Sequence, residues 1–120
     1  MNNKSKPIFE DYPIGDKFLG EVSEGKKNGL GMYLFNDETK FVGEFQNNER
    51  NGIGMYYLND GIILTGEWVD GKLSGKGLMS GPDGMFIGEW KNDHQHGFGS
   101  FFSSEEKVLD GEWINGKFVG

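Results

Sequence analysis

Large apolar residues alternate with small or polar ones in short segments along the chain. In Phe86-Ile87-Gly88-Glu89-Trp90 the large residues stand first and last, and a glutamate precedes the last one. A period of two places successive side chains on opposite faces of a β-strand, whereas an amphipathic helix needs a period of about 3.6. The pattern therefore predicts strands, and the glycines inside it argue further against helix.

The same segment recurs along the chain, which marks an internal repeat. Its glycines are spaced by 23, 23, 22 and 23 residues and are Gly20, Gly43, Gly66, Gly88 and Gly111. A Gly-x-Gly pair follows at a fixed offset and ends at Gly31, Gly54, Gly77 and Gly99. We expect four units over residues 18–40, 41–63, 64–85 and 86–108, a partial fifth at 109–120, and a separate segment at 1–17.

Two clusters of turn-forming residues divide each unit into two strands. The first clusters are Glu24-Gly25-Lys26, Asn47-Asn48-Glu49, Asp70-Gly71-Lys72, Asn92-Asp93-His94 and Asn115-Gly116-Lys117. The second clusters are Asn36-Asp37-Glu38, Asn59-Asp60-Gly61, Pro82-Asp83-Gly84 and Ser104-Glu105-Glu106. Such residues suit tight turns and several tolerate positive φ, so each unit is predicted to be one β-hairpin. The expected fold is all-β, an elongated single-layer antiparallel meander.

Counting by twos gives the two faces of this sheet different characters. One face carries the large residues Phe18, Val22, Tyr33, Phe41, Phe45, Tyr56, Trp68, Phe86, Trp90, Phe101 and Trp113. The repeated glycines share this face, and a glycine weakens a strand unless another group fills its space. We therefore expect aromatic rings to lie over the glycines, and we assign structural roles to both glycine sets and to Trp68, Trp90 and Trp113.

A single unit is too small to be stable alone. Half-burial of one ring contributes about 2.5 kcal/mol, at roughly 25 cal/mol/Å² over about 100 Å². Ordering each residue costs about 1 kcal/mol or more. Stacking of neighbouring units must supply the difference, as in other repeat proteins, and predicts a curved or twisted ribbon.

These motifs resemble the MORN (membrane occupation and recognition nexus) repeat, whose pattern is roughly Y-x-G-x-W-x-x-G-x-x-H-G-x-G-x-x-x-x-x-x-D-G. The best match runs from Phe86 through the segment His96-Gly97-Phe98-Gly99. The leading aromatic is never tyrosine here, and the histidine before the glycine occurs only as His96, with Asn28, Asn51 and Ser74 in its place elsewhere. The resemblance implies a scaffold, a membrane-tethering segment or a non-catalytic domain, with partners often held along the groove of the sheet.

Charge and cysteine content narrow the range of functions. The chain has 120 residues, enough for one domain, and a formal net charge of −7, which disfavours nucleic acids and anionic membranes. Cysteine is absent, which excludes disulfides and a thiol nucleophile. No apolar run suits a signal peptide or a membrane span, so we expect a cytoplasmic location, with peripheral membrane association as the alternative.

The sequence offers no set of residues for catalysis, a metal or a cofactor. His94 and His96 are the only histidines, and Asp93 is the only acid beside them, which is too few ligands for zinc. A regular row of carboxylates provides no acid and base with separated pKa values. A dinucleotide fingerprint needs a helix after its glycines, and here a strand follows. We therefore expect that the chain is not an enzyme.

Residues that differ between equivalent positions are better guides to a partner. The candidates on the second strands are Met32, Met55, Tyr57, Leu78, Phe98 and Phe102, on a face that no second sheet covers. A row of glutamates lies opposite the rings, about 10 Å apart, and comprises Glu21, Glu44, Glu67, Glu89 and Glu112. Glu44, Glu67 and Glu89 join the candidates if the row holds a basic segment; alternatively, each glutamate stabilises its own repeat. The six variable residues have the same alternative, packing along the ribbon itself.

Three functions follow as hypotheses. The first is a scaffold that docks a helix or extended segment of another protein, with a preference for basic partners. The second is a peripheral phospholipid-binding module that uses the lysine-bearing turns at Lys26, Lys27, Lys72, Lys76 and Lys91. The third is self-assembly through the open edge strands of the sheet.

The segment before the first unit does not fit the repeat. Phe9, Tyr12 and Ile14 are apolar enough to cap the first strand. Residues before Pro7 are expected to be disordered.

Overall fold

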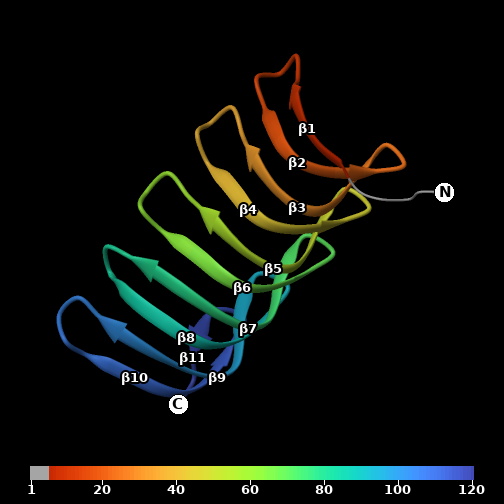
Figure 1. The fold of residues 1–120 in the computed structure, drawn as a ribbon. Helices are drawn as coiled ribbons and strands as arrows, with labels where there is room; N and C mark the ends of the chain where they lie inside the picture. Colours follow the sequence, from red (N-terminus) through yellow and green to blue (C-terminus); the bar gives the residue numbers. More distant parts are fainter. Residues whose placement is uncertain (1–5) are drawn as a thin grey trace.

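The computed structural model describes residues 6–120, which form one open sheet of eleven antiparallel strands. The strands are β1 (Lys6–Asp11), β2 (Lys17–Ser23), β3 (Lys26–Leu34), β4 (Lys40–Gln46), β5 (Glu49–Tyr57), β6 (Ile63–Val69), β7 (Lys72–Gly81), β8 (Gly84–Lys91), β9 (His94–Ser103), β10 (Val108–Ile114) and β11 (Lys117–Phe118). Each strand pairs with its neighbours in sequence, as Figure 1 shows. The predicted all-β meander is confirmed.

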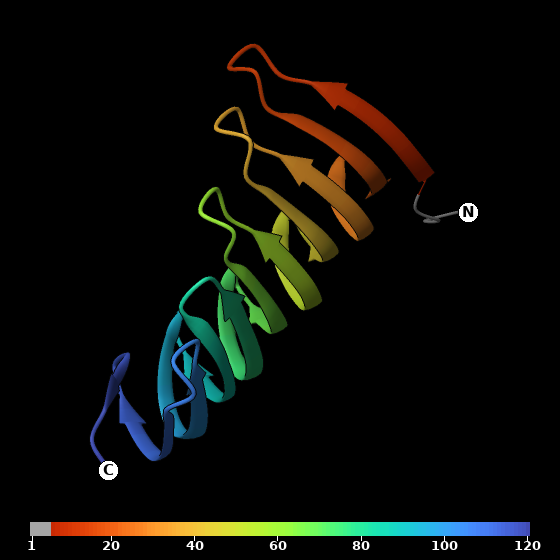
Figure 2. The same ribbon diagram turned by 90° about the vertical axis from the view of Figure 1, so that its left-hand side faces the viewer.

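The sheet is a long ribbon rather than a globule. Its extents are 53, 28 and 18 Å, and the long dimension agrees with eleven strands at about 4.8 Å spacing. The strands curve along their length, and the hairpins stack one after another between the two ends of the chain (Figures 1 and 2). The long axis therefore runs across the strands, from repeat to repeat.

The first turn of each unit is a two-residue hairpin with positive φ at both central residues. In the second unit these are Asn47 and Asn48, at φ of 48° and 73°, and in the third they are Asp70 and Gly71, at 49° and 84°. This geometry matches the right-handed twist of the flanking strands and favours Asn, Asp and Gly. The predicted turn positions are confirmed in all five units.

The first turns also join successive repeats. The amide of Asn48 donates to the carbonyl of Lys27 at 3.0 Å, and the amide of Gly71 donates to that of Arg50 at 2.9 Å. The residue before the Gly-x-Gly pair adds a side-chain bond: Asn28 Oδ1 accepts the amide of Asn47 at 2.9 Å, whereas Asn51 donates through Nδ2 to Asp70 Oδ1 at 3.4 Å. From the second unit on, each first turn is thus bonded to the unit before it.

The second turns are wider and differ among units. Between β3 and β4 the amide of Phe35 donates to Thr39 O at 2.9 Å, and Asp37 Oδ1 accepts from both the amide and the hydroxyl of Thr39. Between β7 and β8 the pairing continues to Gly81 and Gly84, so that connection is shorter. The missing residue of the 22-residue unit is lost at this turn, and the strand register is unchanged.

Nine glycines line up in register across strands β2 to β10. They are Gly20, Gly31, Gly43, Gly54, Gly66, Gly77, Gly88, Gly99 and Gly111. At several of these positions a side chain would collide with a ring: a Cβ at Gly54 would fall on Phe41, with Cε1 at 2.7 Å. Phe18 and Phe86 cover Gly31 and Gly99 in the same way.

The core lies on one face of the sheet. Its buried members are Phe18, Phe41, Phe45, Trp68, Leu73, Phe86, Trp90 and Trp113, with Tyr12, Val22, Tyr33, Tyr56, Leu64, Met79, Phe101 and Phe118 packed against them. Rings meet edge to face, as for Phe41 and Trp68, whose centroids are 5.2 Å apart. We call this cluster the ring face. It contains every large residue that the sequence analysis placed on the face with the glycines.

The third unit departs from the other complete units because Leu64 replaces the leading phenylalanine. The space over Gly77 is filled instead by the indole of Trp90, whose Cδ1 and Nε1 would lie 2.9 Å from a Cβ there. Trp68 and Trp113 donate through Nε1 to Gly54 O and Gly99 O, each at 3.1 Å. Trp90 Nε1 is buried and has no hydrogen-bond partner within residues 6–120.

The second residue after the first turn points onto the ring face and varies in chemistry between units. Arg50 places its guanidinium 5.0 to 5.6 Å from the ring centroids of Phe41, Tyr56 and Trp68. Leu73 occupies the equivalent position in the third unit and is fully buried. The ring face is therefore completed by a cation over rings in one unit and by a leucine in another.

The segment before the first unit extends the sheet by one strand. β1 pairs with β2 from Lys6↔Val22 to Asp11↔Lys17. Tyr12 stacks on Tyr33, whereas the exposed side chains of Phe9 and Ile14 do not join the core. The expected disorder before Pro7 concerns residues 1–5, which lie outside the described residues, and Lys6, which begins β1.

Asp16 anchors the start of the first unit. It is only 6% exposed, and its carboxylate accepts from the Tyr33 hydroxyl and from the amide of Asn36, each at 2.8 Å. These bonds satisfy a buried charge, which would otherwise be costly. The loop after β1 is thereby tied to the first hairpin.

Candidate functional site

The face opposite the rings, here called the open face, is left uncovered along the described ribbon. The sheet is a single layer, so no other element of residues 6–120 packs on this side. Large side chains nevertheless point outward from it, including Phe98 at 72% exposure, Ile87 at 60% and Ile53 at 59%. Monomeric proteins seldom expose a contiguous apolar surface unless it binds something.

Strand register arranges the open face into three parallel rows along the ribbon. The glutamate row contains Leu30, Glu44, Ile53, Glu67, Lys76, Glu89, Phe98 and Glu112. The middle row contains Leu19, Met32, Val42, Met55, Thr65, Leu78, Ile87 and Ser100. The outer row contains Lys17, Leu34, Lys40, Tyr57, Ile63, Ser80, Met85, Phe102 and Val108.

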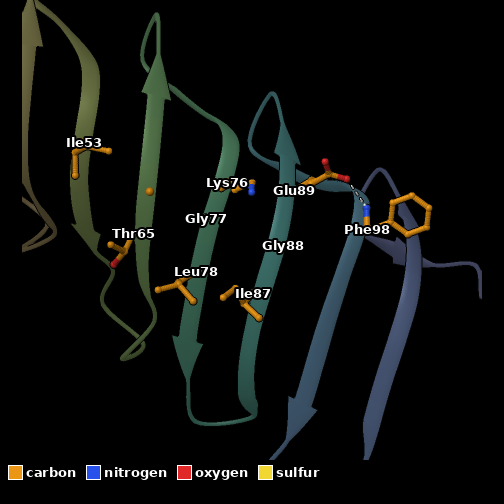
Figure 3. A pocket seen from close by; sticks show the side chains of 10 residues that line it. Ile53, Thr65, Lys76, Gly77, Leu78, Ile87, Gly88, Glu89 and Phe98 are labelled. Carbon is orange, nitrogen blue, oxygen red and sulfur yellow. Dashed lines mark hydrogen bonds between the residues drawn. The ribbon is translucent and has the colours of Figure 1, made fainter.

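A groove of about 630 Å³ runs between the glutamate row and the middle row. Its walls are Ile53, Lys76, Glu89 and Phe98 on one side and Thr65, Leu78 and Ile87 on the other. Its floor is the backbone of Gly66, Gly77 and Gly88. Figure 3 shows these side chains projecting from five adjacent strands, β5 to β9, so the groove crosses the strands and follows the ribbon axis.

The glutamates that alternate with the apolar residues are held by the backbone. Oε1 of Glu21, Glu44 and Glu89 accepts the amide of Leu30, Ile53 and Phe98 at 2.6 to 2.7 Å, and Glu67 accepts that of Lys76 at 3.1 Å. Each bond spans a β-bulge, as at Gly43/Phe45, where β5 carries extra residues opposite Glu44. The carboxylate stabilises its own repeat, as one of the two sequence hypotheses held.

The bulge also requires glycine at a fixed place. Gly52 has a φ of 107°, which favours glycine, and a Cβ there would fall on the carboxylate of Glu44. The glutamate side chain is therefore laid across the glycine and fixed in position. The carboxylates of the glutamate row are therefore held in defined positions along the ribbon.

The variable residues named from the sequence all lie on the open face but not in one row. Phe98 belongs to the glutamate row, and Met32, Met55 and Leu78 belong to the middle row. Tyr57 and Phe102 belong to the outer row, where the Tyr57 ring lies under Lys40 Nζ at 4.9 Å. Of the six, Leu78 and Phe98 line the groove, with Glu89 from the glutamates.

Sequence reasoning missed the groove residues Thr65 and Ile87 and did not put forward Ile53. Thr65 and Ile87 occupy the variable position before the first-strand glycine of their units. The alternation of side chains along the strand could have identified both residues, because this position lies on the same face as the glutamate two residues later. Only the pairing of five strands shows that these residues stand side by side.

His96 makes a hydrogen bond that joins two units. His96 Nδ1 accepts the amide of Asn115 at 3.3 Å, the role that Asn28 and Ser74 take in other units. No group of three His, Cys, Asp or Glu side chains suited to a metal occurs in the part of the chain that the structure describes. The open face offers exposed apolar side chains and carboxylates held by backbone amides.

Residues 6–120 contain no helix, and hence none with the length and apolarity needed to cross a bilayer.

Comparison with known proteins agrees with this geometry. The sequence profile of the MORN repeat matches residues 18–40, 41–63, 65–85, 86–104 and 110–120. No curated protein matches the chain as a whole. Since the matched residues cover well over half of the sequence and each matched segment contains one of the observed hairpins or part of one, the chain belongs to the MORN repeat family.

Proposed function

We propose that the chain is a non-enzymatic docking module that holds a segment of another protein on its open face. MORN repeats are generally modules for interaction with proteins or membranes. The observation that carries the proposal is the apolar groove bounded by Ile53, Leu78, Ile87 and Phe98. Such concave apolar surfaces with a few fixed polar groups are the usual form of a binding site.

The exposed anchors would supply most of the binding free energy. Interfaces depend on a few large side chains that lose contact with water, and aromatic residues are enriched among them. Phe98 and Ile87 are the most exposed large residues of the groove. The glutamates beside them add charge, which favours partners with lysine or arginine.

Selection of peptides on the purified chain tests the proposal. A random peptide library would be selected on the wild-type protein and then measured against Leu78→Asp, which places a charge in the groove, and Ile14→Lys. Ile14 is exposed and lies outside the open face. We expect enriched peptides to lose at least tenfold in affinity with Leu78→Asp and to bind Ile14→Lys as they bind wild type. Equal binding to all three proteins would overturn the proposal.

Membrane association is the competing function, and the structure gives it little support. Lys27 Nζ lies over the rings of Tyr12, Phe18 and Tyr33, and Lys76 stands between Glu67 and Glu89 in the glutamate row. These lysines do not form a cationic patch of the kind that anionic lipids require. Salt-sensitive sedimentation with phosphatidylserine vesicles, absent in Lys72→Glu, would favour the membrane function instead.

A further inference from the structure

We propose that the groove binds an extended segment of another protein in polyproline II conformation, with a lysine or arginine at every third residue. The segment would lie along the ribbon axis, across the strands, and place its basic residues against the glutamate row. This inference rests on the proposed docking function and specifies the partner. It is carried by the width of the groove, the pitch of the repeats and the position of the carboxylates.

The groove is too narrow for the body of a helix. Its two walls come from residues two apart on the same strand, such as Lys76 and Leu78 on β7, so their Cα atoms are about 6.6 Å apart. An α-helix with its side chains is about 10–12 Å across. A single line of side chains can enter between such walls, while the backbone of an extended segment lies above them.

The repeat pitch matches a three-residue period. Two strands at about 4.8 Å give roughly 9.6 Å per repeat, which sets the spacing from Glu44 to Glu67 and from Glu67 to Glu89. One turn of polyproline II contains three residues and rises about 9.3 Å. A helical heptad rises about 10.5 Å and drifts out of phase faster along the row.

The carboxylates are positioned to receive these basic residues. Each of Glu44, Glu67 and Glu89 uses Oε1 for a backbone amide, and Oε2 accepts no hydrogen bond from the described part of the chain. All three side chains are exposed. Ammonium or guanidinium groups would meet carboxylates that are already ordered, which lowers the entropic cost of pairing.

Charge also disfavours the other occupants of this face. Two copies packed with glutamate row against glutamate row would repel each other, in a chain whose net charge is −7. An anionic lipid surface meets the same repulsion. A basic, partly apolar segment satisfies both the charge and the groove.

Lys76 provides an internal control because it is the one basic residue of the glutamate row. The equivalent residues in the other units are Leu30, Ile53 and Phe98. Lys76 therefore weakens the negative potential at the centre of the groove. Lys76→Ile should tighten the binding of a basic ligand and leave an uncharged ligand unaffected.

The probe is a labelled peptide of repeated Lys-Pro-Leu triplets, about fifteen residues long, which spans roughly five repeats at about 3.1 Å per residue. Fluorescence anisotropy with the full chain would compare it with a shuffled peptide of the same composition, a Gln-Pro-Leu peptide and a helical peptide with lysine at every seventh position. We expect the triplet peptide to bind at least tenfold more tightly than the shuffled one. Lys76→Ile should tighten its binding about threefold and leave the Gln-Pro-Leu peptide unchanged.

Other results overturn the inference in distinguishable ways. Equal binding of the shuffled peptide, or tighter binding of the helical one, would overturn the three-residue period while leaving docking intact, provided that Leu78→Asp abolishes both. If no probe binds but peptides selected from a library do, the extended basic ligand is wrong and the docking function stands. A concentration-dependent dimer that Phe98→Asp dissolves would replace the peptide with a second copy.

Discussion

At the scale of single residues, some glycines of this chain are needed because a neighbouring ring occupies the space of a side chain, and others because the backbone has a positive φ. Gly54 shows no positive φ, yet the ring of Phe41 occupies the space where its side chain would stand. Gly25 is the opposite case, with a φ of 77° and no atom within 4 Å of the place that a Cβ would take. Comparing substitutions at these two glycines therefore separates the cost of steric overlap from the cost of placing a side chain in the left-handed backbone conformation.

Substitution by alanine should distinguish these costs. Gly54→Ala displaces the fully buried Phe41 and is expected to lower the free energy of unfolding by about 3 kcal/mol, the upper part of the range for overpacking. Gly25→Ala should cost only about 1–2 kcal/mol, for the left-handed conformation. Urea denaturation followed by tryptophan fluorescence measures both. Equal losses would mean that Phe41 moves aside without cost.

The three tryptophans differ in one hydrogen bond. Trp68→Phe removes a buried bond to Gly54 O, whereas Trp90→Phe removes a buried N–H that has no partner within residues 6–120. We expect Trp68→Phe to be more destabilising than Trp90→Phe by about 1 kcal/mol. Trp113→Phe, which loses the bond to Gly99 O, serves as a second comparison. The measurement is equilibrium denaturation, and a larger loss for Trp90→Phe would contradict the expectation.

Tyr33 should make the fold sensitive to alkaline pH. Burial, together with the hydrogen bond to Asp16, raises the pKa of Tyr33 from 10.0 to about 12. The unfolded chain then loses this proton before the folded chain does, so the contribution of Tyr33 to stability is fully present below pH 10 and is lost as the pH rises towards 12. Tyr33→Phe should reduce this loss, and Tyr57→Phe, on the open face, should not. The check is the denaturation midpoint measured between pH 8 and pH 12.

At the scale of strands and hairpins, local chemistry was enough to predict the elements. Alternation identified the strands, and Asn, Asp and Gly pairs identified the first turns, because both signals depend only on neighbouring residues. Leu73 escaped prediction because its counterparts Lys27 and Arg50 are charged, and only the packing shows that all three point onto the ring face. The groove escaped for a related reason, since its walls combine residues from five strands.

The β-bulge is the feature of the hairpin that could not be predicted from neighbouring residues in the sequence. A glutamate in every repeat was visible, but its hydrogen bond to an amide nine residues later depends on extra residues in the partner strand. Glu44→Ala should leave the amide of Ile53 without this acceptor and cost about 1–2 kcal/mol, with Glu44→Gln retaining part of the bond. Glu105→Ala, in an exposed turn, is the matched control for the loss of a carboxylate. Thermal melting distinguishes the three variants.

At the scale of the whole molecule, the fold is a one-dimensional stack. The Cα radius of gyration is 16.3 Å, whereas a compact globule of this length would have about 14 Å. Small-angle scattering in dilute solution should give a value near the larger figure and a maximum dimension well above that of a sphere. A radius close to the globular figure would show that the ribbon closes on itself in solution.

The two long edges of the ribbon differ in the length of their turns, which affects where residues can be inserted or deleted in a repeat. On one edge every turn has two residues, and from the second unit on each turn bonds to the preceding repeat, as Asn48 does to Lys27 and Gly71 to Arg50. On the other edge the connections vary, and one unit has lost a residue there without disturbing the glycine row. We therefore expect insertions and deletions to be tolerated along this second edge, so that a new loop could be added there without changing the strand register under the groove.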